Sequence, residues 1–189
     1  MRVISGKARG HRLKPPQGMD VRPTSDRVKE SIFNIIQNYI IDSTVVDLFA
    51  GTGNLGIESL SRGAQRAYFV DQSRKSVETI KYNLEKTRLI SSAEIISSDI
   101  SSGIKRIAHK KVQADLIFMD PPYGKGLINS TLSLIVSTNL LKPSGLIVVE
   151  HDKNDEEILV DTEELTCIRK NNYGNTSISF YQLREETTK

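Results

Sequence analysis

The feature that most constrains the fold is a regular alternation of short apolar runs with amphipathic helical stretches between residues 44 and 150. Apolar runs of five or six residues predict strands, and apolar residues at helical spacing predict helices. The predicted strands are Thr44–Phe49, Arg66–Asp71, Ala93–Ser97, Ala114–Met119 and Gly145–Glu150. The predicted helices between them are Asn54–Arg62, Ser73–Thr87, Ile100–Ala108 and Leu127–Thr138. Because strands that alternate with helices form parallel sheets with helices on both faces, the pattern predicts an α/β fold with a Rossmann-like, doubly wound sheet.

The C-terminal part breaks this alternation. Leu165–Lys170 and Thr176–Leu183 both have strand patterns, and a turn at Tyr173-Gly174 separates them without an intervening helix. Two strands joined in this way pair antiparallel. We therefore expect an antiparallel hairpin at the edge of a mixed, seven-stranded sheet. Ligands of such a sheet bind beyond the carboxyl ends of its strands.

The N-terminal part precedes the alternation. Runs at Arg2–Ser5 and His11–Lys14 flank a glycine-containing loop and predict a small β-hairpin. Apolar residues at helical spacing predict a helix over residues 25–39. We expect a basic hairpin and helix appended to a core domain, followed by a frayed tail, with bounds at 1–40, 41–184 and 185–189.

Charge is distributed unevenly along the chain. Residues 1–29 contain eight basic and two acidic residues, a net charge of +6, whereas the remainder carries −3. A basic arm on a slightly acidic body indicates a polyanionic partner, with Arg9 and Arg12 as candidate contacts. The three histidines and one cysteine lack zinc-ligand spacing, so we expect no metal. The chain has no secretory signal and no apolar run near the roughly 18 residues of a membrane span, so we expect a cytoplasmic protein.

A glycine-rich loop, DLFAGTGNLG, follows the first predicted strand and opens the first helix of the alternating region. Gly51, Gly53 and Gly56 let the backbone turn tightly and approach a ligand closely. Asp71, at the end of the next strand, is placed to accept the hydroxyls of a ribose. The same spacing occurs in nicotinamide-binding proteins. Asp47 disfavours that alternative, because its carboxylate repels a pyrophosphate and attracts a cationic sulfonium ligand with a free amino group.

A second motif, Asp120-Pro121-Pro122-Tyr123, stands at the carboxyl end of the strand Ala114–Met119. The prolines fix the backbone and remove two N–H donors, which leaves the Asp120 carboxylate and backbone carbonyls as acceptors. Acceptors that hold both N–H bonds of a base amine direct its lone pair towards an incoming methyl group, and Tyr123 supplies a stacking surface. The motif therefore predicts methylation of an exocyclic base amine, with Asp120, Pro121 and Tyr123 as the catalytic set.

These two motifs resemble motifs one and four of class I amino-methyltransferases, and further segments resemble the RsmD family over nearly the whole chain. The segments that carry this resemblance are RPTSDRVKESIFN at 22–34, NLGIE at 54–58, SRGA at 61–64, and Tyr173-Gly174 with Thr176. The resemblance implies the class I methyltransferase fold, S-adenosylmethionine as cofactor, and methyl transfer to the N2 amine of a guanine in bacterial small-subunit (16S) ribosomal RNA. It implies a monomeric enzyme that acts on RNA in a small-subunit particle.

The resemblance also implies a role for each matching position. The implied cofactor-binding residues are Asp47, Ala50, Gly51, Thr52, Gly53, Asn54, Asp71, Gln72, Asp99 and Ile100. Arg22 and Arg27 would contact RNA next to the cofactor pocket. The chain departs from the family at Asp71, where the family usually has Glu, and the shorter side chain changes the geometry towards the ribose hydroxyls.

Three alternatives stay open beside this interpretation. A DNA adenine-N6 or cytosine-N4 methyltransferase uses the same Asp-Pro-Pro-Tyr chemistry, but the chain lacks the length for a DNA target-recognition domain. A non-catalytic RNA-binding ribosome assembly factor would not need Asp120 and Tyr123. A nicotinamide oxidoreductase is disfavoured by Asp47.

Overall fold

The computed structural model describes residues 1–15, 26–122, 124–154 and 164–184. The helices are α1 (Asp26–Ile35), α2 (Asn54–Ser61), α3 (Arg74–Lys86), α4 (Ile100–His109) and α5 (Leu127–Ser137), with short 3-10 turns at Gln37–Tyr39 and Ile90–Ser92. The strands are β1 (Thr44–Leu48), β2 (Arg66–Asp71), β3 (Ala93–Ser97), β4 (Ala114–Met119), β5 (Leu141–Asp152), β6 (Leu165–Tyr173) and β7 (Thr176–Leu183). The predicted tail at 185–189 lies outside the described residues.

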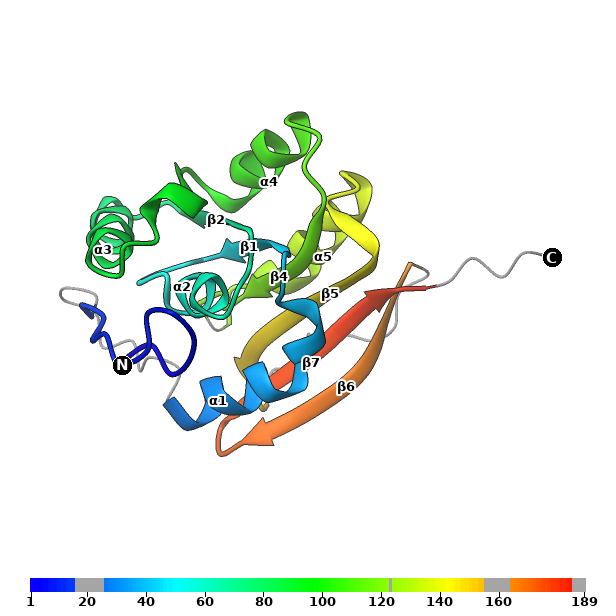
Figure 1. Cartoon of the computed structure of the whole chain (residues 1–189). Helices are drawn as coiled ribbons and strands as arrows, with labels where there is room; N and C mark the ends of the chain where they lie inside the picture. Colours follow the sequence, from blue (N-terminus) through cyan, green and yellow to red (C-terminus); the bar gives the residue numbers. More distant parts are fainter. Residues whose placement is uncertain (16–25, 123, 155–163, 185–189) are drawn as a thin grey trace.

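The seven strands form one sheet in the order β3-β2-β1-β4-β5-β7-β6 (Figure 1). Strands β1 to β5 pair in parallel, while β7 pairs antiparallel with both β5 and β6. The predicted mixed sheet and its antiparallel hairpin are confirmed. The chain leaves β1 towards β2 on one side and later returns to β4 on the other, so a topological switch point lies between β1 and β4.

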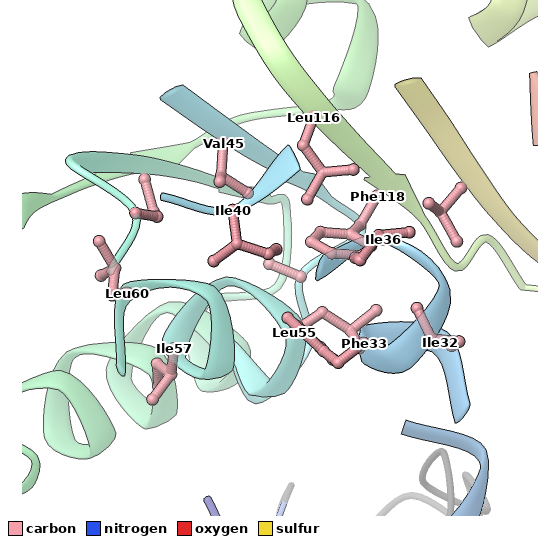
Figure 2. Packing of buried hydrophobic residues seen from close by; sticks show 14 of the residues in the cluster. Ile32, Phe33, Ile36, Ile40, Val45, Leu55, Ile57, Leu60, Leu116 and Phe118 are labelled. Carbon is pink, nitrogen blue, oxygen red and sulfur yellow. The ribbon is translucent and has the colours of Figure 1, made fainter. Parts of the chain in front are cut away.

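Alternate residues of the parallel strands point to opposite faces and build two cores. Val45, Phe69 and Phe118 belong to the core shared with α1, α2 and α3, whereas Val46 and Ile117 belong to the core shared with α4 and α5. Figure 2 shows apolar side chains of α1 and α2 packed against β1 and β4 in the first core. Helices therefore cover both faces, and the site can form only at the strand ends.

The N-terminal segment is a loop closed by one antiparallel bridge, between Arg2 and Arg12. Several of its amides donate to α2 and not to a partner strand: those of Ile4 and Ser5 donate to the Glu58 carboxylate at 2.8 and 3.0 Å. Val3, Ala8 and Leu13 are buried in the same core as α1 and α2. The loop lies beside these two helices in Figure 1 and shares their core.

A buried ion pair joins this segment to both helices. The Lys29 and Glu58 side chains are fully buried, and Lys29 Nζ lies 3.0 Å from Glu58 Oε2. Lys29 also donates to the Arg2 carbonyl at 2.6 Å and to Asn54 Oδ1 at 2.7 Å, so all three of its N–H bonds have acceptors. Glu58 Oε1 accepts in addition from Arg62 Nε at 2.8 Å. The pair therefore fixes α1 and the N-terminal segment against the start of α2.

Breaking this pair should strongly destabilise the protein. Lys29→Met removes the cation and leaves the Glu58 charge buried, which typically costs about 3–5 kcal/mol. Arg62→Gln is the matched control, because Arg62 bonds the same carboxylate from a partly exposed position and should cost about 1 kcal/mol or less. Urea denaturation measures both free energies of unfolding. Equal losses in the two variants would contradict a central role for the buried pair.

Candidate active site

A cavity of about 1180 Å³ opens beyond the carboxyl ends of β1, β2, β4 and β5, at the switch point. The glycine loop, the start of α4, the segment after β4 and the turn between β6 and β7 all line it. The predicted residues among its lining are Asp47, Ala50, Gly51, Thr52, Asn54, Asp71, Gln72, Asp99, Ile100, Asp120 and Pro121. The fold thus brings together groups from both sequence motifs.

The glycine loop is shaped by close packing against the sheet. Gly53 caps the start of α2 with a φ of +75°, a conformation that side chains disfavour. A Cβ on Gly56 would lie 2.3 Å from the Phe69 ring, so only glycine lets α2 approach β2 so closely. The Gly56 amide donates to Asp47 Oδ2 at 2.9 Å. Gly53 faces this packing and does not line the cavity, unlike the other predicted residues of the loop.

Asp71, the last residue of β2, binds the glycine loop through a hydrogen bond. Its two oxygens accept the Gly51 amide and the Ser73 amide, each at 2.8 Å. A carboxylate oxygen has two lone pairs, so each oxygen can still accept one further hydrogen bond from a ligand. Asp71 therefore sets the loop geometry as well as lining the cavity.

Asp99 lies between β3 and α4 and also lines the cavity. It is the N-cap of α4, where its Oδ1 accepts the Ser102 amide at 2.9 Å. Hydrogen bonds from Ser102 lower the pKa of the Asp99 carboxyl. An acceptor that is ionised at neutral pH thus stands beside the apolar side chain of Ile100 at the cavity wall.

Asp120 follows β4 and lies between two other acids. Burial, together with the neighbouring Glu150 and Asp47 carboxylates, raises the pKa of Asp120 well above its ordinary value. Burial likewise raises the pKa of Asp47 to about 7, against the opposing effect of the Gly56 hydrogen bond and with a further increase from Asp71. Carboxylates with raised pKa values are stabilised in their ionised form when a cation binds nearby.

Acidic side chains dominate the lining of the cavity. Six acidic side chains line it, and the described lining residues include no Lys, Arg or His. The acidic residues are Asp47, Asp71, Asp99, Asp120, Glu150 and Asp152. Such a lining suits a cationic ligand and opposes the pyrophosphate of a dinucleotide. The acidic side chains therefore fit a cofactor that has a sulfonium group and a protonated amine.

Several cavity residues were not predicted from sequence. Glu150 and Asp152 lie at the end of β5, and Val28 reaches the cavity from α1. The turn at 173–176 also lines it, and the hydroxyls of Tyr173 and Ser31 are hydrogen-bonded. Glu150 is the last residue of a predicted strand, and an acid at that position is a signal that could have marked it. Tyr123 lies outside the described residues.

Of the four arginines predicted to contact RNA, three can be placed. Arg9, Arg12 and Arg27 are exposed, and Arg27 precedes the cavity residue Val28. Arg22 lies outside the described residues. The exposed guanidinium groups leave these positions open to a phosphate backbone.

Fold and site together define a class I methyltransferase that uses S-adenosylmethionine. The family model described as Conserved hypothetical protein 95 matches residues 1–182. The chain belongs to this family, which is the RsmD family.

Individual relatives agree with the family assignment. Ribosomal RNA small subunit methyltransferase D of Haemophilus influenzae is 35% identical over 183 residues, which are 96% of this chain and 93% of the relative. The protein of that name in Escherichia coli is 35% identical over 80% of this chain and 75% of the relative. The solved Escherichia coli structure described as a candidate methyltransferase, yhhF, superimposes with a TM-score of 0.84 at 30% identity over 97% of this chain and 98% of that one.

Across the described parts of the chain, no group of three or more His, Cys, Asp or Glu side chains is arranged to hold a metal ion. No helix within those parts has both the length and the apolar character that a membrane span requires.

The raised pKa of Asp47 makes cofactor affinity depend on pH. Below pH 7 the carboxyl is largely protonated, and a cationic ligand must displace that proton, so affinity should rise about tenfold from pH 6 to pH 7.5. Isothermal calorimetry with S-adenosylmethionine measures this. Asp47→Asn keeps an oxygen acceptor for the Gly56 amide and should bind more weakly with a much smaller pH dependence.

Asp99→Asn is the control for this experiment, because the pKa of Asp99 is lowered and its charge does not change in this range. That variant should lose affinity equally at both pH values. A wild-type affinity that is constant from pH 6 to pH 7.5 would contradict the role of Asp47.

Proposed function

We propose that this protein transfers a methyl group from S-adenosylmethionine to the exocyclic N2 amine of a guanine in small-subunit ribosomal RNA. The observation that carries the proposal is the position of Asp120, which stands in one acid-lined cavity with the glycine loop. The names of the relatives support ribosomal RNA as the substrate. A small-subunit particle is the expected form of that substrate.

In this proposal the glycine loop and its neighbours hold the cofactor. Asp47 and the loop from Ala50 to Asn54 enclose its methionine part, and Asp71 with Gln72 meets the ribose. Asp99 and Ile100 meet the adenine. A solved structure of the same fold, SMU.776, with a TM-score of 0.63 at 16% identity, holds S-adenosylhomocysteine, the product form of the cofactor, which supports this use of the fold.

The chemistry at Asp120 follows from its charge and setting. When bound, the cofactor supplies an electrophilic methyl group on a positively charged sulfur. Asp120 accepts N–H bonds of the amine and directs the nitrogen lone pair at that carbon, so that an N–C bond forms as the S–C bond breaks. Positive charge develops on nitrogen, where the Asp120 carboxylate stabilises it, and the surplus proton leaves to Asp120 or to water. Pro121 is buried, and its ring restricts the backbone next to Asp120.

Asp120→Ala should abolish most activity while cofactor binding persists. Because Asp120 acts on the amine mainly in the transition state, turnover should fall at least about a hundredfold. The assay is transfer of labelled methyl groups to small-subunit particles that lack the modification, with the methylated nucleoside identified by mass spectrometry. Calorimetry should give a cofactor affinity within about threefold of wild type.

The outcomes of this assay separate the alternatives. N2-methylguanosine from the wild type supports the proposal, whereas methyladenosine or methylcytidine would overturn the guanine assignment. Absence of transfer by the wild type to any RNA would favour an assembly factor. Normal turnover by Asp120→Ala would contradict the amine-binding role.

The exposed arm should supply electrostatic affinity for RNA. Each phosphate contact releases counterions, so Arg9→Gln with Arg12→Gln should weaken binding and reduce the slope of log affinity against log salt by about 1 to 1.5. Substitution is the appropriate test, because deletion of the segment would also remove the buried Val3 and Leu13 and expose the core against which they pack.

A double variant on the other face is the matched control. Lys105→Gln with Arg106→Gln removes the same charge from exposed positions of α4, on the face of the sheet opposite α1. It should leave the salt slope unchanged. Equal slopes for the two double variants in filter binding would show that the arm does not contact phosphates.

A further inference from the structure

Two acidic side chains stand next to each other at the ends of adjacent strands. β4 and β5 pair in parallel with Met119 opposite Val149, so Asp120 and Glu150 follow at the same level. Neighbouring strands lie about 4.8 Å apart, which brings the two backbones close together. Phe118 and Val148 face the same core, so by alternation Asp120 and Glu150 also face one side. Both line the cavity, and Glu150 is only 6% exposed.

The order of the strands gives these acids different surroundings. β4 lies between β1 and β5, so Asp120 has Asp47 and the glycine loop on one side and Glu150 on the other. The electrostatic effect of both neighbours on Asp120 agrees with this arrangement. Glu150 therefore stands beside the proposed amine site, on the side away from the cofactor loop.

This placement matters because bases differ in the ring atom next to their exocyclic amine. In guanine the N2 amine is followed by N1–H, a second donor. In adenine and cytosine the amine is followed by an unprotonated ring nitrogen, an acceptor. An ionised carboxylate only accepts hydrogen bonds, so it attracts N1–H of guanine and repels the lone pair of the other two bases.

We propose that Glu150 is a specificity-determining residue, whose carboxylate accepts N1–H of the target guanine while Asp120 accepts the adjacent N2 amine. This inference rests on the proposed function and names a second base contact for it. Neighbouring acceptors on two strands match neighbouring donors on one edge of the base. An unprotonated ring nitrogen turns its lone pair towards the carboxylate oxygen where guanine offers N1–H, so a base without N1–H is disfavoured.

The decisive probe is 2-aminopurine, which keeps the 2-amino group but has an acceptor at N1. RNA substrate identified by the transfer assay is prepared with guanine or with 2-aminopurine at the target position. Wild-type enzyme should prefer guanine by at least about a hundredfold in kcat/KM. Glu150→Gln should lower kcat/KM for guanine at least tenfold and reduce the preference below about tenfold, because the Gln amide can donate to an unprotonated N1.

Asp152→Asn is the matched control. Asp152 lines the same cavity from the same strand, and the variant removes the same charge, so it should retain the wild-type preference whatever its rate. Cofactor affinity of Glu150→Gln within about threefold of wild type shows that the site is intact. If that variant fails to fold, the wild-type comparison of the two bases still decides.

Different results would contradict the role of Glu150 and the proposed function on which it rests. Wild-type enzyme that methylates both bases within threefold of each other, or Glu150→Gln with an unchanged preference, would overturn the role of Glu150 alone. Wild-type enzyme that leaves the guanine substrate unmethylated would overturn the proposed function.

Discussion

The buried pair of Lys29 and Glu58 is the interaction on which the arrangement around the cavity depends. Two charges removed from water cost several kcal/mol each, and only a complete set of partners compensates for that cost. The pair and its partners come from three parts of the chain: the N-terminal segment, α1 and α2. Lys29 donates hydrogen bonds to Arg2 and Asn54. Glu58 accepts hydrogen bonds from Ile4, Ser5 and Arg62. Neither helix can shift without leaving a charge unpaired. Since Val28 and Asn54 adjoin the pair and line the cavity, the cavity wall is held by the same bonds.

A second buried side chain, that of Asn83, holds the glycine loop and the N-terminal segment in place through further hydrogen bonds. Its Nδ2 donates to the Thr52 carbonyl at 3.0 Å and to the Lys14 carbonyl, while its Oδ1 accepts the Lys14 amide at 2.7 Å. The end of the N-terminal loop is thus tied to α3 and to the glycine loop at one point. The N-terminal segment, which was predicted to be an appended arm, is thus joined to the core by hydrogen bonds at Ile4 and Ser5 and again at Lys14.

Much of the fold could be predicted from sequence because its signals are local. Arg66–Asp71, Ala93–Ser97 and Ala114–Met119 have the predicted bounds, since each is a compact run between helical stretches. β5 begins earlier than predicted, at Leu141, because Lys142, Pro143 and Ser144 interrupt the apolar pattern while a register shift still lets this part pair with β4. β6 continues through polar residues up to Tyr173 because pairing with β7 decides its length. Strand ends that depend on a partner cannot be found in a single run of residues.

The residues of the site also divide into those that a local motif predicts and those that only the fold brings together. Asp47, Asp71 and Asp120 were found because each belongs to a short motif whose residues act together. Glu150 was missed because its proximity to Asp120 comes from the register of β4 against β5, which no local pattern contains. Lys29 was counted with the other basic residues of the arm for a similar reason, because its burial depends on an acid 29 residues away.

The acidic lining of the cavity has a consequence for how RNA can approach it. The chain is positive overall, with a net charge of +3, yet its cavity lining carries six acids. The sugar–phosphate chain is therefore attracted to the outer surface and repelled from the interior, which favours cationic groups and uncharged groups rich in N–H bonds. A nucleotide satisfies both conditions only if its base is turned out of the stack while its backbone stays outside. Under the proposed function, the cavity charge would favour an extruded base over a stacked base or a free phosphate.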